Sequence, residues 1–401
     1  MNKRVQDVAI IGGGIAGPVT ALALHKAGIR ATVYESYPST ADGLGGTIAL
    51  APNGMAALEI VGAADAVRAV AEPAYRQAMA VGEKRVAMPA LTGVEPYQVV
   101  RRSDLYRILR DRATAEGITI EHGRRLVEAR EEGDRVTAVF ADGSTVTADV
   151  LIGADGVQST VRRLIDPDAP GPRYTGMLAF EGVSAFEAPE EPGTMTFAFG
   201  KRGYYIYWPA LGGGTTFGVN VPHPRPLTIK EARAVPSREW MTTLLDVYGE
   251  DAPGGDLLRN LPPEKLQVNG ALYIMPPVPR WHRGRLVLVG DAVHAPSNSS
   301  GQGASLAIES SIEVARCLRD IEDVSTAFAT YERTRRARVE RIAARAAKIN
   351  QAKAPGPVAR ALMPVIMPIF LKVAMKPEKT LGPDQRYRID WPAEPSHNRT
   401  R

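Results

Sequence analysis

Three glycines near the start of the chain are the residues whose type and spacing point most directly to chemistry. Gly12, Gly14 and Gly17 follow an apolar run at residues 7–11, and Glu35 comes roughly 20 residues later. Gly12 permits a tight turn out of a buried strand, Gly14 lets a pyrophosphate approach the main chain, and Gly17 lets a helix pack closely on that strand. This spacing predicts a site for the phosphates of a dinucleotide.

The element after these glycines must be a helix for that chemistry to work. Ile15 and Ala16 begin it, and Pro18 lies in its first turn, where a missing N–H costs little. Free N–H groups and the helix dipole attract phosphate at such an N-terminus. A second strand at residues 31–34 brings Glu35 to hydrogen-bond a ribose. The pattern does not separate NAD from FAD, and an ordinary structural βαβ unit is the alternative.

The rest of the chain shows two kinds of pattern. Apolar runs at 150–152 and 286–289 predict further buried parallel strands of a Rossmann-like α/β domain. Residues 174–221 instead alternate with a period of two and are rich in aromatic side chains, which predicts an inserted mixed or antiparallel β-sheet. Helices are expected at 53–61 and at 103–116, the latter with its first residue, a serine, as N-cap.

Further candidate binding residues follow the later strands. Asp155 and Gly156 come after one predicted strand, and Asp291 comes after another. Residues 300–304, Ser-Gly-Gln-Gly-Ala, open a predicted helix. Taken alone, Asp155 could be a turn residue and Asp291 a helix cap.

The joint presence of these motifs in this order resembles the class A flavoprotein monooxygenases of the para-hydroxybenzoate hydroxylase fold. The resemblance covers roughly residues 5–350 and is nearest to the compact natural-product and antibiotic-modifying members. It implies a discontinuous FAD-binding domain, an inserted substrate-binding sheet domain, and a C-terminal helix and tail. The FAD-binding domain is expected to comprise residues 1–75, 100–170 and 280–345. The substrate-binding sheet domain is expected at 76–99 and 171–279, and the C-terminal helix and tail at 346–401.

The resemblance also implies which residues contact FAD. The glycine turn with Glu35 matches the part that holds the ADP half, Arg102 matches an FAD-binding arginine at a helix start, and Asp291 matches the residue beside the ribityl chain. The helix opened by 300–304 is implied to point at the flavin pyrimidine ring, where its N–H groups stabilise negative charge. The implied FAD contacts are Gly12, Gly14, Ile15, Ala16, Gly17, Glu35, Arg102, Leu126, Asp155, Gly156, Asp291, Gly301, Gly303 and Ala304.

An activity is implied by the same resemblance. NADPH or NADH would reduce FAD, O2 would add to give a flavin C4a-hydroperoxide, and one oxygen atom would hydroxylate an aromatic or polyketide-like small molecule. A same-fold epoxidase, Baeyer–Villiger-type oxygenase or flavin reductase is the first alternative, and a non-oxidative flavin-binding cyclase or carrier is the second. No catalytic residue is assigned, because the flavin carries the difficult chemistry. His294 is expected to belong to a loop scaffold, and the sequence contains no metal-ligand cluster.

Substrate contacts are expected from the aromatic-rich sheet. Alternation places Tyr205 and Tyr207 on one face and Tyr204, Ile206 and Trp208 on the other, without indicating which face lines the pocket. Ordinary core packing is the alternative for about half of any such set. The candidates are Phe180, Phe199, Tyr205, Tyr207 and Asn220.

Composition excludes several other classes of protein. The chain has 401 residues, a net charge of +5 and a single cysteine, which fits a reducing compartment rather than a disulfide framework. Basic residues gather at 332–348, where Glu and Arg four positions apart predict a solvated helix face and no nucleic-acid site. No transmembrane segment is expected, and we expect a cytoplasmic monomer or homodimer. Residues 358–375 are expected to pack on the core, and capping the pocket, packing across both domains or meeting another subunit are the alternatives. The tail from Pro377 is expected to be loose.

Overall fold

The first predicted strand forms the centre of a six-stranded sheet. The computed structural model describes residues 4–39, 45–352 and 376–392. The sheet has the order β18-β19-β12-β1-β2-β8, and all neighbours run parallel except the edge strand β18. β1 is buried from its second residue onward, as expected for an apolar strand covered on both faces. The strands are β1 (Asp7–Ile11), β2 (Arg30–Tyr34), β8 (Thr119–Glu121), β12 (Val150–Gly153), β18 (His282–Arg283) and β19 (Leu286–Leu288).

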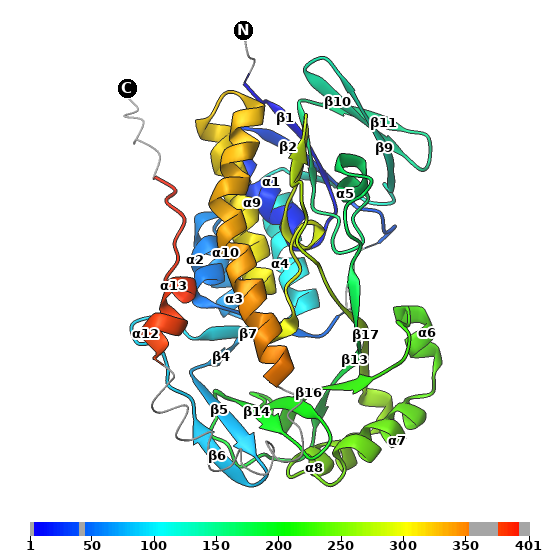
Figure 1. The fold of residues 1–401 in the computed structure, drawn as a ribbon, viewed down its shortest axis with the longest axis vertical. Coiled ribbons are helices and arrows are strands. Elements are labelled where there is room, and N and C mark those ends of the chain that lie inside the picture. Colours follow the sequence, from blue (N-terminus) through cyan, green and yellow to red (C-terminus); the bar gives the residue numbers. More distant parts are fainter. Residues whose placement is uncertain (1–3, 40–44, 353–375, 393–401) are drawn as a thin grey trace.

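Helices pack on one side of this sheet, and a three-stranded sheet with the order β11-β10-β9 lies on the other (Figure 1). α9 lies at the centre of the helical layer, where it packs against α1, α2 and α10. The helices of this layer are α1 (Ala16–Lys26), α2 (Pro52–Ile60), α3 (Ala64–Arg68), α4 (Arg102–Ala115), α9 (Gly303–Asp320) and α10 (Val324–Ala352). The short helix α5 (Thr160–Ile165) instead contacts β9 of the three-stranded sheet. The strands are β9 (Leu126–Glu132), β10 (Arg135–Phe140) and β11 (Thr145–Ala148).

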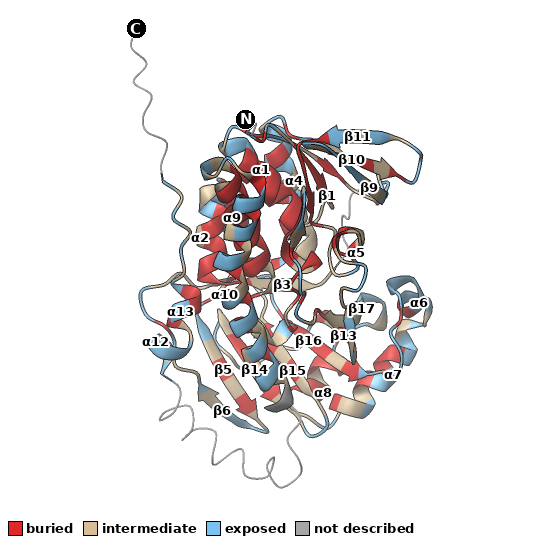
Figure 2. Ribbon diagram, turned by 45° about the horizontal axis from the view of Figure 1, so that its top comes forward, coloured by how far each residue is buried: buried red, intermediate tan, exposed pale blue. Residues whose placement is uncertain are grey.

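A seven-stranded sheet forms the other half of the molecule (Figure 2). Its order is β17-β13-β16-β15-β14-β5-β6, and it is mixed because β14 pairs in parallel with β5. Its strands are β5 (Arg76–Val81), β6 (Lys84–Ala87), β13 (Arg173–Ser184), β14 (Thr194–Phe199), β15 (Tyr204–Pro209), β16 (Thr215–Pro222) and β17 (Gln267–Ile274). The helices next to it are α6 (Ile229–Ala234), α7 (Ser237–Tyr248) and α8 (Gly254–Arg259).

A small sheet with the order β3-β7-β4 lies between the two larger sheets (Figure 1). Its strands are β3 (Thr47–Leu50), β4 (Glu72–Ala74) and β7 (Tyr97–Arg101). Apolar side chains of all three strands pack against β14 and β15 of the seven-stranded sheet. This contact sets the distance between the predicted dinucleotide site and the aromatic-rich strands.

The C-terminal segment at 376–392 contains α12 (Pro377–Thr380) and α13 (Gly382–Gln385) and is not loose. Asp384 is buried and pairs with Arg345 of α10 at 2.5 Å, and the guanidinium of Arg319 lies 4.3 Å from the ring centre of Trp391. The expectation of a loose tail is wrong for this segment, because these contacts come from helices distant in sequence. The expectation for 358–375 lies outside the described residues. Within the described ranges, no helix combines the length and apolar character needed to cross a bilayer.

Candidate functional site

The glycine turn has the geometry that its spacing predicts. Gly12 has φ +109°, and a Cβ there or at Gly17 would overlap backbone atoms, of Ala154 in the first case and of Gly12 in the second. A Cβ at Gly14 would meet no atom within 4 Å. Close packing therefore explains the first and third glycines, while open space lies in front of the second. Ile15 is the N-cap of α1, so the helix N-terminus faces the same space.

The carboxylate of Glu35 lies beside this turn at the end of β2. It accepts hydrogen bonds from the N–H of Gly13 at 2.7 Å and from the N–H of Tyr37 at 2.8 Å. The N–H of Arg124 donates to the carbonyl oxygen of Glu35 at 2.8 Å, which brings the start of β9 at Leu126 close by. Gly13 was not among the predicted contacts, although it is the middle glycine of a run of three. The ribose and adenine contacts of Glu35 and Leu126 stay predictions.

Asp155 caps α5. Its carboxylate accepts hydrogen bonds from the hydroxyl of Ser159 at 2.5 Å and from the N–H groups of Thr160 at 2.7 Å and Val161 at 3.1 Å. Burial raises the pKa of Asp155, and these three donors oppose that shift. The carboxylate therefore serves the helix in this structure, and FAD contact by Asp155 and Gly156 stays a prediction.

Arg162 joins this motif to the loop that follows β19. Its guanidinium is buried and donates hydrogen bonds to the carbonyl oxygens of Ala292 at 2.8 Å and Val157 at 3.0 Å. Burial also lowers its pKa. No role was predicted for Arg162, because its two partners lie on different segments and leave no local pattern in the sequence.

Asp291 and Arg102 face each other from that loop and from the start of α4. Burial raises the pKa of Asp291, and the nearby guanidinium of Arg102 opposes that shift. In the described part of the chain Asp291 has no side-chain hydrogen bond, and the Nε of Arg102 is buried without a partner. A carboxylate and a guanidinium with unused bonding capacity fit a ligand that carries both hydroxyls and phosphates, as FAD does. The predicted cap by Ser103 is wrong, since Arg101 is the N-cap of α4.

The N-terminus of α9 is a second open position. Gln302 is its N-cap and makes no side-chain capping bond, so the first N–H groups of the helix remain available. A Cβ at Gly303 would meet no atom within 4 Å, as at Gly14. Gly301 ends the preceding 3-10 turn η3 (Asn298–Ser300), and the half-buried Ala304 packs on the core. Contact of Gly301, Gly303 and Ala304 with FAD stays a prediction.

His294 is a buried part of the loop between β19 and α9. Its Nε2 lies 2.8 Å from the hydroxyl of Ser310, which also accepts a hydrogen bond from Arg335 at 3.2 Å. A hydroxyl can donate one hydrogen bond and accept two, so Ser310 can partner either tautomer of a neutral His294. Burial, aided by the charge of Arg335, lowers the pKa of His294 to about 3. A neutral, buried imidazole agrees with a scaffold role.

We expect His294 to make the fold sensitive to mild acid. Its folded-state pKa of about 3 lies below the usual 6.5, so its stabilising contribution is complete above pH 6.5 and falls as the pH drops toward 3. The slope from this one residue is about 1.4 kcal/mol per pH unit. The charged groups that face it are Arg335 and Glu309. A His294→Gln variant should therefore show a flatter curve of unfolding free energy between about pH 6 and 4.5, measured by urea denaturation.

The exposed His122 provides the control. His122→Gln should leave the slope unchanged, and His282, whose pKa burial also lowers, titrates in all three proteins. A His294→Gln curve parallel to that of the wild type would contradict the neutral assignment.

Three of the predicted substrate contacts are core residues. Phe180, Tyr205 and Tyr207 lie on the face of the seven-stranded sheet that α6, α7 and α8 cover, and all three are buried. Phe180 packs 5.0 Å from the ring of Trp240, and Tyr205 packs 5.6 Å from that of Tyr248, both on α7. This burial favours core packing, the alternative given above, because alternation defines two faces and tertiary packing decides which one is covered. Contact of these three residues with a substrate stays a prediction.

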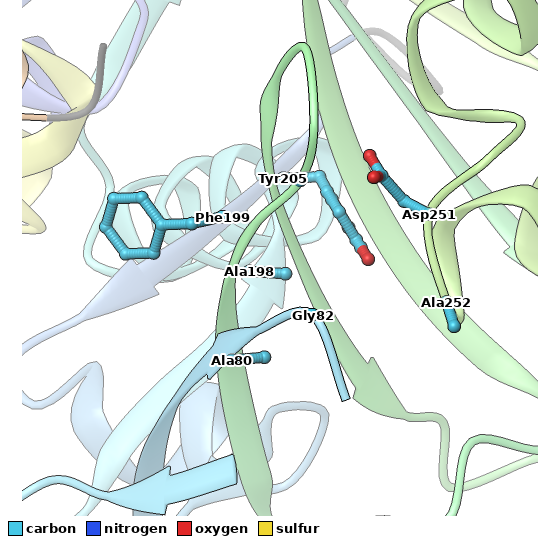
Figure 3. Close-up of a pocket in the computed structure, with 8 residues that line it drawn as sticks. Ala80, Gly82, Ala198, Phe199, Tyr205, Asp251 and Ala252 are labelled. Atoms are coloured by element: carbon cyan, nitrogen blue, oxygen red, sulfur yellow. The ribbon is translucent and has the colours of Figure 1, made fainter. Parts of the chain in front are cut away.

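Phe199 and Asn220 lie on the opposite face, which is turned toward β3-β7-β4 and is called here the open face. Figure 3 shows the rings of Phe199 and Tyr205 projecting to opposite sides of the sheet. The ring of Phe199 lies 5.3 Å from that of Tyr204 in an edge-on arrangement. Asn220 falls between residues of the covered face, so its side chain lies on the open face. Both side chains are half-buried.

The chain is similar to known flavoproteins over most of its length. A family model described as an FAD binding domain matches residues 5–204 and 277–346. A FAD-dependent urate hydroxylase of Klebsiella pneumoniae is 29% identical over 350 residues, covering 84% of this chain and 88% of that protein. A 3-amino-4-hydroxybenzoate 2-monooxygenase of Streptomyces cremeus is 30% identical over 344 residues, covering 79% of this chain and 80% of that protein. The crystal structure of Klebsiella pneumoniae HpxO with FAD and uric acid superposes with a TM-score of 0.79 at 25% identity, covering 94% of this chain and 95% of that one.

Proposed function

The chain belongs to the FAD-binding-domain family of class A flavoprotein monooxygenases, and from this premise we propose that it hydroxylates a small aromatic or polyketide-like molecule. FAD is the cofactor of this oxidoreductase, NADPH or NADH donates the electrons, and O2 supplies the oxygen atom. The observation that carries the substrate proposal is the half-exposed aromatic character of the open face. Relatives named for urate and hydroxybenzoates support a planar substrate of similar size.

The residues present at the glycine turn and around it fit FAD. Gly14 and the N-terminus of α1 would receive the pyrophosphate, Glu35 the ribose, and Arg102 with Asp291 the phosphate and hydroxyl groups between the two halves. Bound FAD supplies the oxidation–reduction and oxygen chemistry. The chain binds, orients and excludes water, and the free N–H groups of α9 would stabilise negative charge at the ring they face.

A polar corner ends the open face. A Cβ at Gly46 would lie 2.8 Å from Oε2 of Glu181 on β13 and directly against the amide of Asn269 on β17. Glu181 accepts a hydrogen bond from the N–H of Thr47 at 2.8 Å, and burial raises its pKa. The side-chain amides of Asn220 and Asn269 make no hydrogen bond to a described residue. These two amides support a substrate that carries a hydroxyl or carbonyl group on its ring.

The proposed cytoplasmic location follows from the state of the lone cysteine. The lone cysteine, Cys317, is buried and free, which supports a reducing compartment such as the cytoplasm. We place the enzyme there as a monomer or homodimer. Size-exclusion chromatography with light scattering would distinguish the two states.

The substrate proposal is tested with the FAD-loaded protein in air. NADH and NADPH oxidation would be followed by absorbance with phenols, hydroxybenzoates, urate and polyketide aromatics, and products would be identified by mass spectrometry. We expect one class to stimulate oxidation and to yield a product heavier by one oxygen atom. Stimulation only by non-aromatic compounds would contradict the substrate class while leaving the cofactor assignment intact.

The two sheet faces should respond differently to truncation. Asn220→Ala should raise KM for the stimulating substrate by about tenfold, the effect of losing one hydrogen bond of about 1.4 kcal/mol. Phe180→Ala should instead lower the unfolding free energy by about 3–5 kcal/mol with little change in KM, because it leaves a cavity beneath α7. Steady-state kinetics and urea denaturation on both variants check this. A raised KM in a fully stable Phe180→Ala protein would indicate that the Phe180 ring contacts the substrate.

A further inference from the structure

A buried polar cluster joins the start of α2 to the start of α9. The Nδ2 of Asn53 donates hydrogen bonds to Oε1 of Gln302 at 2.9 Å and to Oε1 of Glu309 at 2.7 Å. All three side chains are buried, and Asn53 is only 1% exposed. Gln302 is the N-cap of α9, and Glu309 lies in the second turn of that helix. The side-chain amide of Asn53 therefore contacts both the N-cap residue and the second turn of α9.

The orientation of the Asn53 amide is set by the charge behind it. Glu309 pairs with Arg335 at 2.6 Å and with Arg338 at 2.9 Å, and all three side chains are buried. The two guanidinium groups, Arg335 first, hold the pKa of Glu309 below its usual value against the opposing effect of burial. An ionised carboxylate only accepts hydrogen bonds, so Asn53 must present its NH2 group to it. The Oδ1 of Asn53 has no partner among the described residues, so the site uses the amide only as a donor.

Two further contacts bring the same segment against α9. The N–H of Ala51 donates to the hydroxyl of Ser305 at 3.1 Å. A Cβ at Gly54 would overlap that Ser305 side chain, so only glycine permits this approach. The first turn of α9 is therefore fixed by hydrogen bonds and close packing from residues 51–54, and any loss of the Asn53 bonds acts directly on Gln302.

We propose that Asn53 is a positioning residue that sets the place of the α9 N-terminus relative to FAD, with Glu309, Arg335 and Arg338 fixing its amide. The inference rests on the proposed function only in placing FAD in front of α9. Its consequence is a change in the flavin itself, because N–H groups that move away from the ring stabilise less of the negative charge that FAD gains on reduction.

The test compares Asn53→Ala with Tyr248→Phe in the FAD-loaded protein. Tyr248 is equally buried and donates to the carbonyl oxygen of Asn220 at 2.6 Å, but it lies under the seven-stranded sheet and touches neither α2 nor α9. The measurements are the flavin midpoint potential, the flavin absorbance spectrum, FAD affinity and thermal unfolding, none of which needs a substrate. We expect Asn53→Ala to lower the midpoint potential and to weaken FAD binding roughly tenfold, with Tyr248→Phe at wild-type values for both. Equal potentials in the three proteins would overturn the proposal.

A second variant covers the case in which Asn53→Ala does not fold. Gln302→Met nearly keeps the volume of the side chain and removes the acceptor for Asn53, together with the hydrogen bond between the Gln302 and Tyr97 side chains. If Asn53 acts through Gln302, this variant should lower the potential by a similar amount, and Asn53→Ala should add little on the Gln302→Met background. Fully additive shifts would show independent actions and refute the relay. If the wild type shows substrate-stimulated turnover but the variants leave the flavin potential unchanged, this inference alone is rejected. If the wild type does not bind FAD, the proposed function on which the inference rests is rejected.

Discussion

A Gly14→Val substitution should abolish FAD binding while leaving the stability of the FAD-free protein unchanged. The new side chain would meet no atom within 4 Å of its Cβ, so the fold has room for it. It would occupy the space through which a pyrophosphate approaches the turn, and we expect FAD affinity to fall by about 100-fold or more. FAD absorbance retained after gel filtration measures the first effect, and thermal unfolding of the FAD-free protein measures the second.

Substitutions at two other glycines distinguish a loss of FAD binding from a loss of folding. Gly171 also has open space at its Cβ but lies in an exposed segment, so Gly171→Val should keep both FAD and stability. Gly17→Val should instead prevent folding, because its Cβ would overlap the carbonyl oxygen of Gly12. A Gly14→Val protein that still carries FAD would contradict the placement of the phosphates at this turn.

Removing Glu309 should cause a large loss of stability. Glu309 and Arg335 are fully buried and Arg338 nearly so, and Glu309→Ala would leave two guanidinium groups in the core without their carboxylate. Breaking a buried ion pair from one side costs about 3–5 kcal/mol, because the remaining charge stays desolvated. We expect the urea unfolding midpoint to fall accordingly, or the protein to fail to accumulate in folded form.

Glu250 supplies the matched control for this loss. It pairs with Lys201 at 3.0 Å, but its side chain is 82% exposed. Glu250→Ala should therefore leave the unfolding free energy close to that of the wild type. Equal stability of the Glu309→Ala and Glu250→Ala proteins would mean that the buried cluster does not hold α9 to α10.

Local sequence predicts the central strands and the glycine turn well, since both depend on neighbouring residues. An apolar run followed by glycine, helix and acid determines β1, α1 and the place of Glu35 with little help from the rest of the chain. The cap of α4 is a local failure, because the helix begins at Arg102 without a capping side chain and Ser103 lies inside it. Arg101 is still paired with Thr47 in β7 and keeps an extended backbone, so α4 begins one residue before Ser103.

Long-range packing accounts for what the sequence could not indicate. Period-two alternation separates Tyr205 from Tyr204 correctly, but only the position of α7 shows that Tyr205 belongs to the core. Asn53 and Glu309 lie 256 positions apart, and no local pattern connects them. The residues that hold the site together are therefore harder to predict than those that contact the ligand, because their partners are determined by the complete fold.

Oxygen labelling would show whether this FAD-dependent monooxygenase transfers an atom of O2 to its substrate. The FAD-loaded protein would be supplied with NADPH or NADH and the stimulating aromatic compound under 18O2, and the product analysed by mass spectrometry. We expect one 18O atom per product molecule, with none incorporated from H218O. NAD(P)H consumption with unlabelled product would instead indicate a reductase or an uncoupled oxidase, and failure to bind FAD at all would contradict the account from its first step.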